Sequence, residues 1–305
     1  MILVTGATGF LGKRVCHLLD NLGRKYTSTS LSLGLDLRDR QATIDYFKDI
    51  KPKYVLNCAA YVGGIQFGYK HPGELFHNNL QITLNLLEVC KEFNITRMVN
   101  PISNCSYPGD STFFKEDEYW DGPLHESVMV YGFVRKASWV GGWAYAKQYN
   151  LDVLNLIFSN MYGPEDHFEE ERSHALGALI MKFVQAKKCN APEVVVWGSG
   201  NPVREWLHVD DAAEAMVRGL DVIKTPELVN VGVGRGVSII DMAELIKNLV
   251  EYDGLLKLDQ SKPDGAPYKT VDGSRGQKLF GWSPSRDFNQ GVKETIEWYL
   301  NNEGK

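Results

Sequence analysis

Three glycines near the start of the chain have a spacing that lets a backbone approach phosphate groups. Gly6, Gly9 and Gly12 follow the apolar run 1–5, and apolar residues at helical spacing continue over 13–20. Between a strand and a helix, the first glycine permits a tight turn, the second lets the backbone reach a pyrophosphate, and the third lets the helix pack on the sheet. The helix N-terminus then points at the phosphates. The pattern predicts a dinucleotide site; the alternative is a tight strand-to-helix turn alone.

Polar stretches also follow other predicted strands. Residues 57–60 (Asn-Cys-Ala-Ala) end one strand pattern, residues 103–108 (Ser-Asn-Cys-Ser-Tyr-Pro) follow the next, and residues 160–164 (Asn-Met-Tyr-Gly-Pro) follow a later one. In a doubly wound sheet, ligands bind beyond the carboxyl ends of the strands. We therefore expect these stretches to line one site, with the helix that begins near Tyr131 beside them.

The elements that must position these residues alternate along the first half of the chain. Strand patterns at 1–5, 26–31, 54–57, 98–102 and 153–158 are separated by helical patterns at 13–21, 41–50, 75–93 and 134–148. This rhythm predicts a parallel sheet covered on both faces. The expected fold is α/β, a Rossmann-type doubly wound parallel sheet with a smaller C-terminal α/β substrate domain.

The second half of the chain is less regular. We expect helices at 173–188, 210–222 and 288–300, a strand at 194–197, and a helix to about residue 252 that Ser238 and Asp241 open as a capping box. This half is interpreted as a substrate domain interleaved with the first. The dinucleotide-binding domain would comprise 1–160 and about 205–235, and the substrate domain about 161–204 and 236–305.

Composition excludes several classes of function. A net charge of −5 over 305 residues argues against nucleic acid as the main partner. No apolar run approaches the roughly 18 residues of a membrane span, and no basic segment precedes the first apolar run, so we expect neither a membrane anchor nor a signal peptide. The five cysteines are scattered without a Cys-x-x-Cys pair, which suits reduced thiols in the cytoplasm and gives no metal site.

Longer stretches match a known family nearly end to end. The most specific are residues 58–65, 103–108, 173–174, 194–211 and 261–265. With these, the chain resembles the extended short-chain dehydrogenase/reductases, and within them the GDP-L-fucose synthase family, which are GDP-4-keto-6-deoxymannose 3,5-epimerase/4-reductases. The resemblance implies NADP(H)-dependent epimerisation and reduction of a GDP-linked 4-keto-deoxy sugar. It also implies a homodimer that pairs through helices 75–93 and 134–148.

The resemblance assigns catalytic roles to particular residues. Tyr131 matches the proton donor to the C4 oxygen, Ser103 the serine that hydrogen-bonds this oxygen, and Cys105 and His174 the base and acid at C3 and C5. The chemistry is reasonable because a 4-ketone acidifies both neighbouring C–H bonds, and a thiol and an imidazole titrate near neutrality when modestly tuned.

The resemblance also implies two sets of binding residues. The substrate set is Lys182, Trp197, Arg204 and Asp272. The cofactor set is Gly6, Thr8, Gly9, Phe10, Leu11, Gly12, Ser30, Asp36, Ala59, Ala60, Tyr131, Arg135 and Asn160.

One departure from the family lies at its Tyr-x-x-x-Lys motif. Here Arg135 is four residues after Tyr131, and Lys136 follows one later. Helix positions four apart share a face, whereas the next residue turns away by about 100°. Arg135 should therefore face Tyr131 and the nicotinamide ribose; a helix adjustment that brings Lys136 inward is the alternative. Arginine keeps the positive charge but cannot release a proton.

A second departure concerns the cofactor. Thr8, Ser30 and Ser32 stand where the family has arginines for the 2′-phosphate of NADP, and no acid ends the second strand to favour NAD. Hydroxyls at 28–32, with Arg14 near, could accept a phosphate. NADP(H) is preferred and NAD(H) is possible.

Further departures leave the sugar open. Asn104 replaces a serine, and the acidic, aromatic segment 110–126 bears little resemblance to the family. One alternative function is a 4-keto-reductase without epimerisation, acting on a related GDP-sugar or heptose. Another is a non-catalytic cofactor-binding protein.

Overall fold

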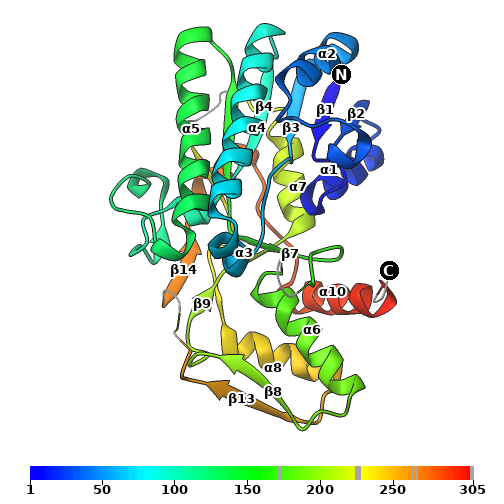
Figure 1. Cartoon of the computed structure of the whole chain (residues 1–305), viewed down its shortest axis with the longest axis vertical. Coiled ribbons are helices and arrows are strands. Elements are labelled where there is room, and N and C mark those ends of the chain that lie inside the picture. The colour runs from blue at the N-terminus through cyan, green and yellow to red at the C-terminus, as the bar shows by residue number, and fades with distance from the viewer. Residues whose placement is uncertain (170–172, 224–227, 263, 265–266, 303–305) are drawn as a thin grey trace.

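A six-stranded parallel sheet forms the centre of the computed structural model, which describes residues 1–169, 173–223, 228–262, 264 and 267–302. Its strand order is β11-β6-β4-β3-β1-β2 (Figure 1). The strands are β1 (Ile2–Thr5), β2 (Tyr26–Thr29), β3 (Tyr54–Asn57), β4 (Arg97–Ser103), β6 (Val153–Phe158) and β11 (Val229–Val231). Since the order reverses between β1 and β3, ligands are expected beyond the carboxyl ends of these two strands. The predicted doubly wound fold is confirmed.

Helices cover both faces of this sheet. On one face α1 (Phe10–Asn21) packs beside α7 (Val209–Arg218), and the other face carries α2 (Arg40–Ile50), α4 (Pro72–Glu92) and α5 (Met129–Tyr149). Every residue of β6 is buried, as expected for a strand with both faces covered.

The turn from β1 to α1 depends on glycine. Gly6 has φ +62°, and a Cβ there would lie 2.5 Å from the carbonyl carbon of Cys58. A Cβ on Gly12 would lie 2.1 Å from the carbonyl oxygen of Gly6. Both approaches are far closer than any side chain allows, so this turn is built for close packing of backbone on backbone.

A second core lies at the bottom of Figure 1. The parallel pair β8 (Glu193–Trp197) and β13 (Leu255–Asp259) packs with α6 (Ala175–Lys188), α8 (Ile239–Val250) and α10 (Phe288–Asn302). The cap predicted for α8 is confirmed, because the Ser238 hydroxyl accepts a hydrogen bond from the Asp241 amide at 3.1 Å.

Two small sheets lie between the large sheet and the second core. One has the order β12-β9-β14-β5 and comprises Val237–Ser238, Val203–Arg204, Tyr268–Val271 and Phe113–Phe114. The other pairs β10 (Trp206–His208) with β7 (Asn160–Tyr162). Through β5, the segment 110–126 reaches β14. Sequence patterns did not predict these short strands.

Some predicted boundaries were wrong. The strand expected over 26–31 ends at Thr29 and a 3₁₀ turn, η1 (Leu31–Leu33), follows; the helix expected over 210–222 ends at Arg218. The short helices α3 (Ile65–Lys70) and α9 (Ser274–Phe280) and the 3₁₀ turns η2 (Asn104–Ser106), η3 (Glu116–Glu118) and η4 (Glu126–Val128) complete the described elements. None of the described helices is long and apolar enough to cross a membrane.

Candidate active site

The glycine loop lies against the ends of its neighbouring strands. The Ala7 amide donates to the Thr29 carbonyl at 3.0 Å, and the Asn57 carboxamide oxygen accepts from the Thr5 hydroxyl at 2.8 Å and the Ala59 amide at 3.1 Å. These bonds bring residue 59 beside the loop, with the exposed Ala60 following it. The loop and the end of β3 therefore lie side by side, as the strand order requires.

The start of α1 fits a phosphate group. Gly9 precedes the helix and offers no side chain to cap its first amides, which begin at Phe10 and Leu11. Uncapped amides at a helix N-terminus donate well to anionic oxygens. Leu11 is buried in the core and Phe10 packs beside it, so both hold the helix in place.

Arg135 is a buried cation stacked on Tyr131. Its guanidinium carbon lies 4.8 Å from the centroid of the Tyr131 ring, and its side chain is only 5% exposed. One terminal nitrogen donates to the Asn79 side-chain oxygen at 3.3 Å, and Asn79 also binds both backbone groups of Tyr61. The buried Nε of Arg135 has no hydrogen-bond partner among the described residues. An unpartnered donor here fits the hydroxyls of a bound nicotinamide ribose.

Lys136 is held elsewhere. Its ammonium lies 4.3 Å from the ring centroid of Tyr119 and 4.2 Å from that of Trp120, and it donates to the Tyr119 carbonyl. Burial lowers the pKa of Lys136 below its usual value. The register expected for this helix is therefore observed: Arg135 contacts Tyr131, whereas Lys136 fastens the segment 110–126 to α5.

Replacing Lys136 with Met should reduce stability without changing cofactor binding. The variant loses two cation–π contacts and a charged hydrogen bond, so we expect the free energy of unfolding to fall by about 1–2 kcal/mol. Denaturant unfolding and a titration with NADPH measure the two effects. A variant of normal stability that no longer binds NADPH would contradict this placement.

Cys105 and Ser103 lie directly against the start of α5. Ser103 ends β4, and its hydroxyl accepts from the Cys105 amide at 3.2 Å. A Cβ on Gly132 would lie 2.5 Å from the Cys105 carbonyl oxygen, so the helix turn that carries Tyr131 contacts η2 without any intervening side chain. Asn104, which lies between Ser103 and Cys105 in the chain, is buried. The structure thus brings Ser103, Cys105 and Tyr131 onto adjoining backbone.

Two cations lie close to Cys105. Arg204 of β9 and Lys269 of β14 are register partners in the small sheet. Burial lowers the pKa of both side chains, and the nearby Cys105 opposes this shift in each. Both cations therefore interact electrostatically with Cys105.

His174 stands apart from this group. It precedes α6 and is exposed to solvent, yet the surrounding protein, and His167 to a lesser extent, lower its pKa below the usual value. No hydrogen bond or ion pair within the described residues joins it to Cys105 or Tyr131.

The predicted substrate residues divide into two places. Trp197 is 56% exposed, and the ammonium groups of Lys182 and Lys262 lie 5.4 Å and 5.5 Å from its ring centroid. An open indole face flanked by two cations suits a planar base carrying phosphates. Arg204 instead belongs to the other place, where it interacts electrostatically with Cys105.

Asp272 performs a local role. Its carboxylate accepts from the Ser274 amide at 3.0 Å at the start of α9. Asp264 is better placed near the substrate residues, because it binds the Ser199 amide at 2.8 Å and hydroxyl at 2.6 Å and lies near Arg204. The stretch 261–265 matches the family, but neither Lys262 nor Asp264 was predicted from the sequence to bind substrate. Residues 263 and 265 of that stretch lie outside the described residues.

Asp36 and Asn160 already have local partners. The Asp36 carboxylate forms an ion pair with Arg38 at 2.7 Å, and this arginine lowers its pKa. The Asn160 side-chain amide donates to the Glu205 carbonyl at 3.0 Å. Neither arrangement shows a contact that only a cofactor would explain.

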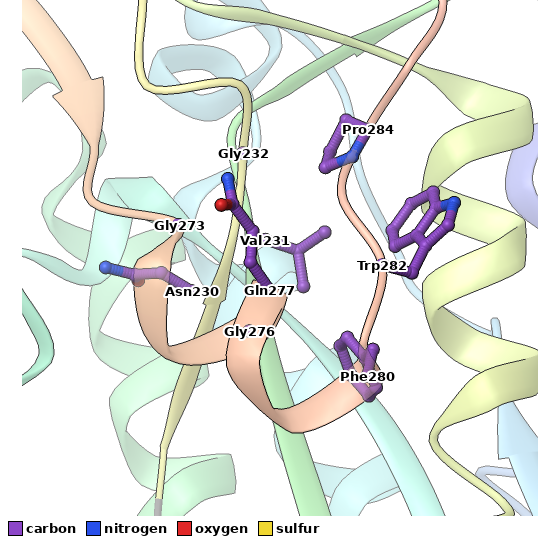
Figure 2. A pocket seen from close by; sticks show the side chains of 9 residues that line it. All are labelled: Asn230, Val231, Gly232, Gly273, Gly276, Gln277, Phe280, Trp282 and Pro284. Carbon is purple, nitrogen blue, oxygen red and sulfur yellow. The ribbon is translucent and has the colours of Figure 1, made fainter.

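A crevice between β11 and α9 is a different feature (Figure 2). Three glycines, Val231, Phe280, Trp282 and Pro284 line much of it, and no titratable side chain does. It therefore lacks the groups needed for proton transfer. Within the described residues no cluster of His, Cys, Asp or Glu could hold a metal ion.

Known proteins resemble the chain over nearly its whole length. The sequence model of the NAD dependent epimerase/dehydratase family matches residues 2–232. A probable GDP-L-fucose synthase 1 of Oryza sativa subsp. japonica is 37% identical over 303 residues, covering 99% of this chain and 92% of that protein. A solved GDP-L-fucose synthetase from Naegleria fowleri bound to NADP has a TM-score of 0.91 at 30% identity, covering 99% of this chain and 92% of its own. A solved GDP-6-OMe-4-keto-L-xylo-heptose reductase from C. jejuni has a TM-score of 0.91 at 25% identity, covering 99% of this chain and 98% of its own.

Proposed function

The chain belongs to the NAD dependent epimerase/dehydratase family, and we propose that it acts as a GDP-L-fucose synthase, an NADP(H)-dependent epimerase and 4-keto reductase of a GDP-linked deoxy sugar. The resemblance to the GDP-L-fucose synthases inferred from the sequence is confirmed by full-length relatives. Within the structure, the observation that supports this function best is the Tyr131–Arg135 stack beside Cys105.

Reduction needs a hydride and a proton at the 4-ketone. NADPH supplies the hydride when bound. Tyr131 donates the proton to the C4 oxygen, Ser103 hydrogen-bonds that oxygen, and the Arg135 charge stabilises the tyrosinate left behind. The phenol recovers its proton from solvent because arginine does not release one.

Epimerisation needs a base on one face of the sugar and an acid on the other. Cys105 removes a proton from a carbon next to the ketone, and His174 returns one from the opposite side. Arg204 and Lys269 offset the negative charge that forms near Cys105. The GDP group binds at Trp197, Lys182 and Lys262, at the other end of the nucleotide sugar.

A reductase without epimerisation is the second candidate. It is favoured by the close structural likeness to the heptose reductase from C. jejuni. Cys105 and His174 together favour the epimerase, because reduction of a ketone by hydride uses neither a thiol nor an imidazole.

Incubation with a panel of GDP-linked 4-keto sugars in heavy water, with NADPH or NADH, distinguishes the candidates. NMR of the products should show deuterium at C3 or C5 and a reduced C4. A reduced product without deuterium would support the reductase alone. Cofactor binding without turnover of any sugar would support a non-catalytic protein.

Replacing Cys105 with Ser should suppress deuterium incorporation by about 10²-fold or more, because a hydroxyl is a much weaker acid than a thiol and a poor general base at neutral pH. The affinity for NADPH should stay within about twofold, since this residue belongs to the sugar end of the site. Isotope exchange by NMR and NADPH fluorescence measure the two quantities. Unchanged exchange would remove Cys105 from the mechanism.

We also propose that the cofactor and the nucleotide sugar bind to different domains of the chain. Residues 1–160 and about 205–235 would hold the cofactor, and about 161–204 and 236–305 the nucleotide sugar. β5 is an exception, since it pairs with β14 across this division. We place the enzyme in the cytoplasm, in keeping with five cysteines that are all free thiols.

An apolar stripe on α4 and α5 supports a homodimer. The two helices pack side by side (Figure 1), and Phe76 stacks on Phe133 with centroids 6.1 Å apart. These two rings are exposed, as are Leu84, Val140 and Trp143 on the same two helices. Exposed large side chains at this helical spacing are typical of an interface. A second copy pairing here would form a four-helix bundle.

Replacing Trp143 with Asp should convert the dimer to a monomer, because a charge would be buried in the pairing surface. Sedimentation velocity measures the change. Ile223, an exposed apolar residue outside these helices, serves as the control when replaced by Asp. A wild-type protein that sediments as a monomer would contradict the proposed pairing.

A further inference from the structure

Three hydroxyl groups meet beside the glycine loop. The Thr8 hydroxyl lies 3.0 Å from that of Ser30 and 2.8 Å from that of Ser32, and the two serine hydroxyls are 3.0 Å apart. Thr8 and Ser32 are exposed, whereas Ser30 is buried. A closed triangle of hydroxyls, open on one side to solvent, is a preformed group of hydrogen-bond donors and acceptors.

The triangle lies where the adenosine ribose of a dinucleotide binds in sheets of this type. Thr8 lies in the loop between β1 and α1, and the two serines directly follow β2. In a sheet of this type, residues after the second strand contact the adenosine ribose, where an acid binds the 2′-hydroxyl of NAD and an arginine accommodates the 2′-phosphate of NADP. In this chain both kinds of residue are replaced by hydroxyls.

The neighbouring cations have other partners. Arg38 is bound by the Asp36 carboxylate at 2.7 Å and by the Asn78 side-chain oxygen at 3.0 Å. Arg14, expected from the sequence to lie near the serines, donates to the Pro164 carbonyl at 3.0 Å and lies 3.7 Å from Asp210. Within the described residues, no arginine therefore forms a hydrogen bond with the triangle.

We propose that Thr8, Ser30 and Ser32 form an uncharged receptor for the 2′ substituent of the cofactor. The inference rests on the proposed NADP(H)-dependent function. When a phosphate group binds, each hydroxyl can rotate away from its two neighbours and donate a hydrogen bond to an anionic phosphate oxygen. Such a hydrogen bond is roughly twice as strong as one to a neutral acceptor. A 2′-hydroxyl can form only bonds between neutral groups at this place, so the loss of one of them costs NADH little. The enzyme thus prefers NADPH over NADH by about tenfold or less, and since no ion pair is involved, salt changes this ratio little.

Direct titration of the full-length protein with NADPH and with NADH, at low and high salt and without sugar, tests the proposal. Thr8→Val and Ser32→Ala should each weaken NADPH binding about tenfold and leave NADH binding within about twofold. Ser32→Arg should strengthen NADPH binding and make it fall with salt. Thr27→Val is the matched control, because that hydroxyl lies on β2 and donates to the Met1 sulfur at 3.4 Å.

Equal losses for both cofactors in Thr8→Val would overturn the proposal, because the hydroxyls would then merely support the loop. So would a wild-type preference well above tenfold that collapses at high salt, which would reveal a cation at the phosphate. Neither result depends on turnover of a sugar. A failure of the proposed sugar chemistry therefore leaves this test readable.

Discussion

Tyr131→Phe should abolish reduction of the 4-keto sugar while proton exchange at C3 or C5 continues in part. The change removes one oxygen and keeps the ring that stacks on Arg135 at 4.8 Å. The cofactor site should therefore stay intact, and the affinity for NADPH should change by less than about twofold. A positioned acid contributes on the order of 10²–10⁴-fold to a proton-transfer step, so turnover should fall at least 10²-fold.

Two measurements on the same sample separate the effects. NADPH consumption reports reduction, and deuterium incorporation from heavy water reports exchange through Cys105 and His174. Tyr145→Phe is the matched control, because Tyr145 lies on the same helix and donates to Glu88 instead of facing the site. Reduction at a near-normal rate in Tyr131→Phe would show that another group protonates C4.

Local chemistry made the first half of the site predictable. Gly6 and Gly12 have contacts that only glycine permits, so their spacing carried information about backbone geometry. The helical repeat was equally informative at Arg135 and Lys136, because a rotation of about 100° between neighbours places one on Tyr131 and the other on Tyr119. Such inferences need only the conformation of one element.

Contacts between distant segments could not be predicted in this way. Lys269 interacts electrostatically with Cys105 because β14 pairs with β9, and each of these strands is too short to give a periodic pattern. The aromatic partners of Lys136 come from the segment 110–126, which has no regular hydrophobic repeat. The position of Asp264 beside Ser199 depends on the conformation of a loop. Asp272 was chosen from the resemblance alone, and one of its carboxylate oxygens accepts a hydrogen bond from the Ser274 amide at the start of α9.

Arg135→Met should weaken NADPH binding about tenfold and slow reduction by about 10²-fold. The variant keeps a similar apolar volume but loses the charge beside the Tyr131 ring, the donor to Asn79 and the unpartnered Nε. Arg135→Lys should retain activity or raise it, because an ammonium keeps the positive charge and restores a group that can release a proton. Fluorescence titration with NADPH and single-turnover reduction measure binding and chemistry separately.

Lys136→Met completes this series, because it removes the neighbouring cation from the same helix. Its ammonium is held by the rings of Tyr119 and Trp120, so its loss should lower stability and leave both reduction and NADPH affinity near normal. A destabilised but active Lys136→Met beside a stable and slow Arg135→Met would establish arginine as the working cation. The reverse pattern, with Lys136→Met inactive and Arg135→Met normal, would mean that the helix turns in solution to present lysine. Normal reduction in both variants would mean that Tyr131 needs no cation at all.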